Sequence, residues 1–364
     1  MPSITLSRAD LALLAPRWRA LEREANGSFF QGWTWLGCLA AERFPDPVLL
    51  AAESEGRTVG LALFNRTRDR LGHTALWLGE SGDPALDAVY VEHNGVLLAP
   101  GYEALAGPCL RAAHRATLDG RRGPRRVVLS GLGSAQALAA GEAGAAVRLR
   151  QVHPAPLADL RRPGVYLDGL SRNARHQLRR SARDYEATGS LLVERAGTEA
   201  EALGFLDALI ALHQATWAAR GRPGAFATET VRRFHRVLIG RGVASGEVDL
   251  LRVSAGAAPV GYLLNFRHRG RVLAYQSGFD YAGAGPHRKP GLTCHHQAIE
   301  WYRAAGALSY DFLAGPDRYK ATLADGAQEL RWIELLPRWS PHGMAVRARG
   351  AAVRLRAAAE RLRS

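Results

Sequence analysis

The spacing of apolar residues predicts helices followed by paired strands in the first part of the chain. Apolar positions recur at helical intervals over residues 8–24 and again over residues 28–44. Residues 48–64 then hold two β-rich runs around a Glu-Gly turn, which is typical of a hairpin. A Pro-Gly pair at residues 100–101 opens another helical pattern, and this pattern leads to a strand at residues 126–130.

The same order of elements returns about 200 residues later. A helical segment at residues 226–240 precedes a hairpin at residues 248–266, in which two β-rich runs surround an Ala-Gly turn. Pro290-Gly291 then opens a helix that leads to a strand at residues 308–313. Self-similarity of this kind indicates two tandem copies of one unit. We therefore expect an α/β fold in which helices pack on a mixed sheet, as in α+β proteins.

The segment at residues 153–164 separates the two copies, because it is rich in Pro and Arg and lacks periodicity. We expect one unit over residues 1–155, a second over residues 156–340 and a basic C-terminal helix over residues 341–364. Within the second unit a helix is predicted to begin after Ser171, a residue type that caps helices.

Positive charge is concentrated in two segments of the chain. The formal net charge is +14. Residues 161–183 carry seven arginines against one aspartate, and residues 341–364 carry six arginines against one glutamate, so they contribute 6 and 5 of these charges. Such patches attract phosphates of any kind, which leaves tRNA, a nucleotide cofactor and a membrane surface open. Arginine-rich helix faces that simply meet solvent are the alternative.

The overall composition is that of an ordinary globular protein, with 47% hydrophobic and 23% charged residues. The three cysteines lack metal-binding or redox spacing, and no run of about 18 apolar residues exists to span a bilayer. We therefore expect a cytoplasmic protein without disulfides or a membrane span. Cys294-His295-His296 predicts no metal site, because adjacent helical side chains diverge and no second cluster supplies further ligands.

A basic loop precedes the helix that the second Pro-Gly pair opens. Arg288 and Lys289 stand just before this helix, and the N–H groups of Gly291, Leu292 and Thr293 would be the unpaired donors of its first turn. A helix N-terminus with added positive charge binds phosphate groups readily, and a glycine permits their close approach. An ordinary β-to-α loop with exposed basic residues is the alternative.

Residues from about 165 to 336 resemble the GNAT acyltransferase branch that includes proteins named after the cellulose biosynthesis protein CelD. The resemblance is carried by Ser171, Arg172, Arg175, Arg179, Arg180, Arg183, Gly189, His213, Trp217, Arg220, Gly221, Phe226, Tyr275, Pro290, Gly291, Asp311, Phe312, Leu313, Gly315, Tyr319 and Lys320. The segment DFLAGPDRYK is its most specific part. The tandem GNAT-like arrangement is similar to FemAB-like proteins, and the active site is expected in the C-terminal copy, since the N-terminal Pro-Gly loop lacks nearby Lys or Arg.

This resemblance implies an enzyme that transfers an acyl group from acyl-CoA, either acetyl-CoA or a longer donor, without a metal. A small-molecule amine or amino sugar would attack the thioester directly. In GNAT folds a backbone N–H of a splayed central strand polarises the thioester carbonyl, which places that donor near Tyr275 to Gly278. Tyr319 would protonate the departing thiolate, or it would anchor its loop as a packed ring. The loop departs from the usual GNAT pattern at Thr293, where a Gly or Ala is expected.

Asp311 alternates with aromatic residues in a predicted strand, where a carboxylate is costly unless it is paired or faces a cleft. It would therefore orient or deprotonate the amine, or else pair with an Arg or Lys. Lys320 would grip a phosphate or carboxylate, or neutralise Asp311. His213 and Trp217 lie four residues apart on one helix face, where they would line the acceptor pocket or simply pack together.

Arg179 and Arg180 belong to the arginine-rich helix of the resemblance and would contact an anionic acceptor, the phosphates of the donor or solvent. Two other functions follow from the same resemblance. FemAB-like relatives use aminoacyl-tRNA, which the two arginine-rich segments would hold. A catalytically silent GNAT-like protein would instead act as a scaffold in polysaccharide or natural-product assembly.

Overall fold

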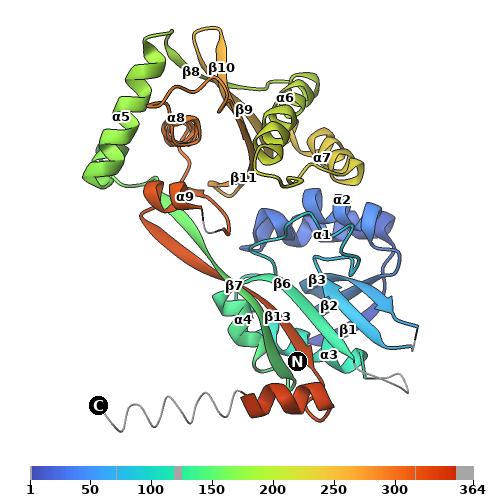
Figure 1. Cartoon of the computed structure of the whole chain (residues 1–364). Coiled ribbons are helices and arrows are strands. Elements are labelled where there is room, and N and C mark those ends of the chain that lie inside the picture. Colours follow the sequence, from blue (N-terminus) through green and yellow to red (C-terminus); the bar gives the residue numbers. More distant parts are fainter. Residues whose placement is uncertain (1, 71, 119–124, 316, 350–364) are drawn as a thin grey trace, which may run out of the picture. The chain divides into compact units, whose positions relative to one another are not determined.

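The computed structural model in Figure 1 describes residues 2–70, 72–118, 125–315 and 317–349. Its chain forms two compact units. Unit 1 extends to Val152 and takes up the chain again from Glu329, while unit 2 comprises His153–Gln328. Two strands, β7 (Ala146–Asp159) and β13 (Gly326–Leu336), each cross a boundary between these ranges.

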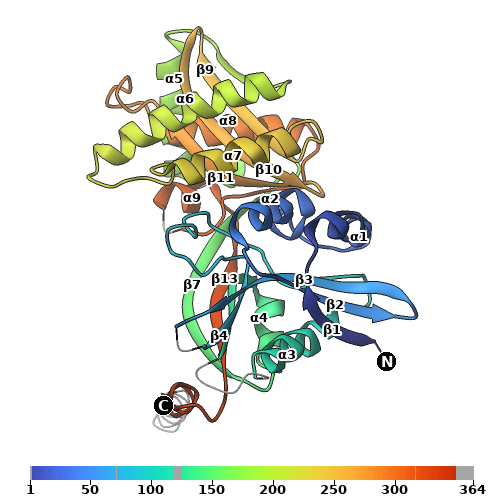
Figure 2. The same ribbon diagram turned by 90° about the vertical axis from the view of Figure 1, so that its right-hand side faces the viewer.

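Unit 1 is a mixed sheet with helices on both faces, as Figure 2 shows. Its strands follow the order β1-β2-β3-β4-β6-β13. The predicted hairpin is confirmed, because β2 and β3 pair antiparallel. The elements of this unit are β1 (Ser3–Arg8), α1 (Leu11–Glu24), α2 (Trp33–Arg43), β2 (Pro47–Ser54), β3 (Arg57–Arg68), β4 (Thr74–Leu78), β5 (Leu97–Leu98), α3 (Ala106–Ala116), β6 (Arg126–Gly133) and α4 (Ser134–Ala140), with short 3-10 turns at Phe29–Gln31 and Glu103–Leu105.

In unit 2 the strands follow the order β7-β12-β11-β10-β9-β8, with both parallel and antiparallel neighbours. Helices α6 and α7 cover one face of β9, β10 and β11, and α8 covers the other face together with α5 (Figure 1). The elements are a 3-10 turn at Tyr166–Gly169, α5 (Arg172–Glu186), β8 (Leu191–Arg195), α6 (Glu199–Ala218), α7 (Glu229–Gly242), β9 (Val248–Ala255), β10 (Ala258–His268), β11 (Arg271–Phe279), α8 (Pro290–Ala304), β12 (Ser309–Asp311) and α9 (Arg318–Leu323).

The two series of elements correspond in order, apart from the two-residue β5. The series β1-α1-α2-β2-β3-β4-α3-β6-α4-β7 is matched by β8-α6-α7-β9-β10-β11-α8-β12-α9-β13. In each, the first strand pairs antiparallel with the first strand of the hairpin, and the strands before and after the crossover helix pair in parallel. This correspondence confirms the predicted mixed α/β fold built from a repeated unit. The helix α5 lies between the two series.

The last strand of each series pairs with a strand of the other series. β7 pairs with β12 through Leu157–Asp159, and β13 pairs with β6 through residues Leu330–Leu335. Each sheet is therefore completed by a strand from the other repeat.

Helix α5 forms where the sequence predicts it. The Ser171 hydroxyl accepts a hydrogen bond from the N–H of Ala174, and so caps the first turn. The buried stripe contains Leu178, Ser181 and Tyr185. Ser181 is fully buried, whereas the next residue, Ala182, is half-buried. A hydroxyl buried on an otherwise apolar face requires a partner, and that partner belongs to the candidate site.

The C-terminal basic helix is described in part. Residues 341–349 are helical. The remainder of the predicted helix, residues 350–364, lies outside the described residues.

Candidate active site

Strands β11 and β12 diverge after a short parallel pairing. Their register comprises three pairs, from Arg271 opposite Ser309 to Leu273 opposite Asp311, whereas β11 continues to Phe279. Beyond Leu273, the described residues provide no partner strand for the β12 side of β11. A parallel pair that separates in this way exposes backbone N–H and C=O groups to a bound molecule. The chain then turns through residues 280–289 into α8.

A bulge and a close helix contact shape the open part of β11. Leu264 of β10 faces Gln276, and the next residue, Asn265, faces Ala274, so Tyr275 is the extra residue of a β-bulge. Further along the strand, α6 crosses at Gly278. A Cβ atom at position 278 would lie 2.3 Å from the carbonyl oxygen of Leu209, so this close approach requires glycine.

The loop before α8 is anchored on α5 by one buried hydroxyl. Ser181 Oγ accepts a hydrogen bond from the backbone N–H of Lys289 at 2.8 Å. The same atom lies 2.8 Å from the hydroxyl of Thr293 in the first turn of α8. Ser181 is fully buried, so these bonds are shielded from water. The hydroxyl on the apolar face of α5 therefore holds the start of α8 in place.

Within the part of the chain that the structure describes, two N–H groups at the start of α8 have no hydrogen-bond acceptor. The Thr293 N–H donates to the carbonyl of Lys289 at 2.9 Å, so the expectation that it is a free donor is wrong. Lys289 is the capping residue and Pro290 has no N–H, which makes Thr293 the first residue able to bond within the helix. Within the described residues the N–H groups of Gly291 and Leu292 have no acceptor.

Basic side chains from two elements flank this helix start. Arg180 of α5 donates to His287 Nε2 at 2.7 Å. Arg288 donates to the carbonyl oxygen of Asp184 at 2.9 Å, and its guanidinium lies 4.8 Å from the ring centre of Tyr185. Lys289 is exposed. The structure thus brings Arg180 to the predicted loop.

Arg179 has a different environment from its neighbour Arg180. Its Nη2 lies 3.9 Å from a carboxylate oxygen of Asp168, in the 3-10 turn before α5, and its side chain is 59% exposed. Among the described residues no contact joins it to the loop.

Gly291 packs against the end of β11. A Cβ atom at position 291 would lie 3.2 Å from the hydroxyl of Tyr281 and 3.2 Å from the ring of Phe279. The glycine therefore allows α8 to approach both rings. Leu292 is half-buried beside it.

Asp311 is engaged by two partners at the end of β12. Its Oδ2 accepts from Arg271 at 3.1 Å, and its Oδ1 accepts from the N–H of Leu313 at 2.8 Å. The side chain is fully buried. These contacts favour the interpretation of Asp311 as the partner of a basic residue. That residue is Arg271, whereas the sequence suggested Lys320.

Lys320 stabilises the turn that follows β12. Its Nζ donates to the carbonyl oxygen of Ala314 at 2.8 Å and lies 3.4 Å from that of Leu313. Leu313 has a φ of 59°, a conformation that is costly for a branched side chain. The cation and the Asp311 carboxylate thus hold opposite ends of one strained turn. Much of the DFLAGPDRYK segment is accounted for by this turn.

Tyr319 stacks on a histidine of α8. Its ring centre lies 5.0 Å from that of His295, with an angle of 14° between the planes. Burial raises the pKa of Tyr319 above its ordinary value, and the negative charge of Asp317 acts in the same direction. The phenol therefore carries its proton at neutral pH.

His213 uses both ring nitrogens within the fold. Nδ1 donates to the carbonyl of Ser277 at 2.9 Å, because Nε2 accepts from the N–H of Ala225 at 3.1 Å. Burial lowers the pKa of His213, which favours this neutral form. The ring centres of Trp217 and His213 are 5.8 Å apart, and the guanidinium of Arg220 lies 5.5 Å from the ring centre of Trp217. His213 thus links α6 to the backbone of β11 and to the segment that follows α6.

The Tyr275 side chain is not brought to the basic loop. It packs against Phe266 at 4.6 Å and His235 at 5.7 Å, on the face of the sheet that α7 covers. Its backbone, at the bulge of β11, is the part that borders the divergence from β12.

Several residues of this site were not predicted from the sequence. Ser181, Tyr281, Arg271 and His295 all contact predicted site residues. The spacing of Ser181, three residues after Leu178 and four before Tyr185, was the only signal for its burial.

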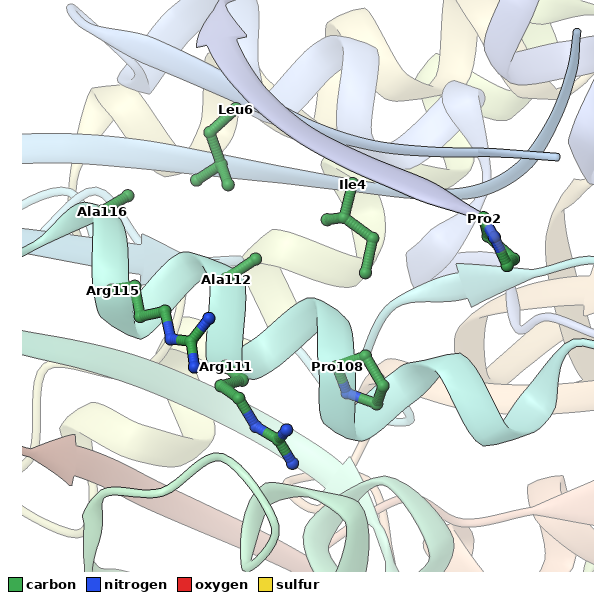
Figure 3. Close-up of a pocket in the computed structure, with 8 residues that line it drawn as sticks. All are labelled: Pro2, Ile4, Leu6, Pro108, Arg111, Ala112, Arg115 and Ala116. Carbon is green, nitrogen blue, oxygen red and sulfur yellow. The ribbon is translucent and has the colours of Figure 1, made fainter.

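Unit 1 contains a groove between β1 and α3, with a volume of about 560 Å³ (Figure 3). It is lined by Pro2, Ile4, Leu6, Pro108, Arg111, Ala112, Arg115 and Ala116. Arg111 already donates to the carbonyl of Glu142, at 2.7 and 3.2 Å. None of the sequence-predicted site residues lines this groove.

Metal-binding clusters and membrane-spanning helices are not found in the described part of the chain. No group of three or more His, Cys, Asp or Glu side chains there could hold a metal ion. No helix there combines the length and hydrophobicity needed to cross a bilayer.

The segment that contains this site matches a known protein family. Residues 172–321 match the family described as "Acetyltransferase (GNAT) domain". No curated protein sequence is significantly similar to the chain. The matched segment runs from α5 to α9 and therefore includes the basic loop, the diverging strands and Tyr319.

Solved structures share the fold across most of the chain. A crystal structure of FemX has a TM-score of 0.60 and 10% identity, covering 90% of this chain and 96% of that one. A conserved protein of unknown function from Bacteroides thetaiotaomicron has a TM-score of 0.56 and 9% identity, with 92% and 100% covered. L-PGS from Bacillus licheniformis has a TM-score of 0.52 and 12% identity, with 88% and 90% covered. At these identities the similarity shows the common fold.

Proposed function

We propose that the protein is an N-acyltransferase that transfers an acyl group from acyl-CoA to a small-molecule amine or amino sugar. The observation that carries this proposal is the start of α8, where the N–H groups of Gly291 and Leu292 have no acceptor among the described residues. Arg180, Arg288 and Lys289 stand nearby. Two free donors and several cations suit the pyrophosphate of coenzyme A. The match of residues 172–321 to an acetyltransferase domain supports acyl transfer.

The thioester would lie along the open part of β11. A backbone N–H between Tyr275 and Gly278 would polarise its carbonyl, since this strand has lost its β12 partner there. The neutral amine attacks the carbonyl carbon, the new C–N bond forms and the C–S bond breaks. The nitrogen of the tetrahedral intermediate releases its extra proton to solvent, so the product is the neutral amide. The departing thiolate takes the proton of Tyr319, whose pKa burial keeps high, and solvent returns a proton to the Tyr319 phenolate.

The other predicted site residues receive supporting roles in this proposal. Asp311 and Lys320 hold the turn that carries Tyr319, through the contacts with Arg271 and the carbonyls of Leu313 and Ala314. Thr293 braces the loop through Ser181. We assign Trp217 to a wall of the acceptor pocket, with His213 holding the adjacent backbone of β11. We further propose that the protein belongs to the CelD-like branch of the GNAT acyltransferases.

An aminoacyl-tRNA-dependent transferase is the second candidate. The fold shared with FemX and the seven arginines of residues 161–183 favour it. In this case the binding constant would fall steeply with salt, because phosphate contacts along an RNA release many counterions.

The decisive experiment measures thermal stabilisation of the full chain by acetyl-CoA and by longer acyl-CoAs, followed by thiol release in the presence of candidate amines. Arg180→Gln is expected to weaken acyl-CoA binding roughly tenfold, as the loss of one charge-assisted phosphate contact would. Arg179→Gln is the matched control, because Arg179 is the neighbouring arginine on α5 but pairs with Asp168. Salt-sensitive tRNA binding without any acyl-CoA effect would favour the second candidate. If neither acyl-CoA nor tRNA bound, the result would favour a catalytically silent scaffold.

A further inference from the structure

His295 lies where β11 and β12 diverge. Its ring contacts Phe279 at the end of β11, Tyr310 in β12, Phe312 after it and Tyr319 in α9, with ring centres between 5.0 and 5.9 Å apart. Only 2% of the residue is exposed. A polar ring enclosed by four aromatic rings needs its nitrogens paired, or it retains an unpaired group for a ligand.

A separate group of buried hydrogen bonds lies in the same core, where the ring centres of Tyr302 and Tyr310 are 6.1 Å apart. Asp249 is fully buried and pairs with Arg195 at 2.7 Å. As a carboxylate it only accepts, so the Tyr302 hydroxyl at 3.0 Å is the donor. The only proton of the Tyr302 hydroxyl is used in this bond, so its oxygen accepts a hydrogen bond from the side-chain amide of Asn265 at 3.2 Å. The direction of donation in this group is therefore fixed from its charged end.

The direction of the bond between Tyr310 and His295 can be deduced from the cost of buried unpaired groups. Tyr310 is fully buried and its hydroxyl lies 2.9 Å from His295 Nδ1. If His295 donated this bond, the Tyr310 proton and the lone pair of His295 Nε2 would both be buried without partners. If Tyr310 donates it, only the Nε2–H of His295 lacks a partner. The second arrangement costs less, because each unpaired buried group costs about 1–3 kcal/mol.

The environment keeps this imidazole neutral. Burial, together with the positive charge of Lys320, lowers the pKa of His295 to about 3. Burial holds the pKa of Tyr310 well above its ordinary value, so its hydroxyl keeps the proton that it can donate to His295.

We propose that the Nε2–H of His295 is a donor for the acyl donor's carbonyl oxygen when the acyl group enters the divergence of β11 and β12. This inference rests on the proposed acyl transfer and adds a side-chain donor to the backbone N–H of β11. A preorganised, water-excluded donor would stabilise the negative charge that develops on the carbonyl oxygen. The parallel stack with Tyr319 places this donor beside the proposed proton source.

The first test determines the tautomer by nitrogen NMR of histidine-labelled protein, with the His295 signals assigned through His295→Gln. The expected result is protonated Nε2 and unprotonated Nδ1. Tyr310→Phe removes the donor to Nδ1, so the Nε2–H population is expected to fall in that variant. Protonated Nδ1 in the wild type would overturn the inference without any reference to activity.

The second test follows the Nε2–H resonance as ligands bind. Acetonyl-CoA, which keeps the acyl carbonyl but cannot be cleaved, is expected to shift it, and free coenzyme A is not. In steady-state kinetics His295→Phe keeps an aromatic ring and loses the donor, so kcat is expected to fall roughly 100-fold with little change in the amine KM. His296→Gln is the control, because His296 faces Glu300 at 3.7 Å. Melting temperatures show whether each variant is folded.

The outcomes separate the two proposals. If no acyl-CoA binds or reacts with the wild type, the proposed function fails and this inference fails with it. If the wild type turns over while the Nε2–H resonance ignores acetonyl-CoA, or folded His295→Phe keeps full kcat, only the inference about His295 is overturned.

Discussion

Ser181 on α5 accepts a hydrogen bond from the backbone N–H of Lys289 at 2.8 Å, across 108 positions of sequence. This contact joins the arginine-rich helix to the basic loop. The start of α8 and Arg180 of α5 therefore lie side by side, although nothing in the local sequence of either element requires it.

Replacing Ser181 by alanine is expected to lower both stability and donor affinity. The Lys289 N–H and the Thr293 hydroxyl lose their buried partner, which costs about 1–3 kcal/mol of the free energy of unfolding. Denaturant unfolding and calorimetric titration with acetyl-CoA check the two effects. Ser171→Ala, which removes the α5 cap away from the loop, should cost about 1 kcal/mol and leave affinity unchanged. If both variants bound acetyl-CoA with equal affinity, the contact between α5 and the loop would not contribute to donor binding.

Asp311→Asn is expected to act through Arg271. The amide retains an acceptor for the Leu313 N–H but leaves the guanidinium without its carboxylate, which costs about 1–3 kcal/mol of unfolding free energy. Arg271→Gln should cost a similar amount, and the double variant less than the sum. If Asp311 were instead the base, Asp311→Asn would remove the acidic limb of the kcat/KM profile and Arg271→Gln would not.

The unfolding free energy should depend on pH through His295. The folded-state pKa is lowered from 6.5 to about 3, so between these values the unfolded chain binds a proton that the folded protein does not. Stability therefore falls as pH decreases from about 6.5, by up to about 1.4 kcal/mol per pH unit.

The matched comparison for this pH effect is His295→Phe. Denaturant unfolding at several pH values should give a shallower slope for the variant below pH 6.5. His296, whose pKa burial lowers to about 4, contributes to both proteins and cancels. Identical slopes would mean that His295 is protonated in the folded state or exposed to solvent.

Gly278→Ala is expected to be strongly destabilising. The new Cβ would lie 2.3 Å from the carbonyl oxygen of Leu209, which belongs to the backbone of α6 and cannot move by itself. Overpacking of this kind costs about 3 kcal/mol. Gly285→Ala is the control, because nothing lies within 4 Å of its Cβ position. Chemical denaturation of the two variants measures the difference.

Local patterns predicted most of the helices and both hairpins, because spacing and turn residues within one segment decide these elements. The strand β1 was missed, since its six residues alternate only briefly and stay largely exposed. The long strands β7 and β13 were also missed. Their partners lie in the other repeat, so no neighbouring segment of sequence signals the pairing.

The sequence predicted those parts of the site whose residues are close together in the chain. It did not predict the contacts between residues that are far apart in the chain and close only in the folded protein. The basic loop and the helix start at Pro290 are local, and the sequence shows them. Asp311 was expected to need a basic partner, but only the register of β11 with β12 brings Arg271 to it. The sequence predicts no metal site at His295 and does not indicate its surroundings, which depend on the aromatic rings of β11, β12 and α9.

The pairing of β7 with β12 and of β13 with β6 has a consequence for folding and engineering. The topology is that of a domain-swapped dimer whose two protomers are joined into one chain. A protein cut between the repeats would give two fragments that each lack a strand of their own sheet and carry a strand belonging to the other. Such fragments should recover structure only when they are mixed, as complementing halves of a single cooperative molecule.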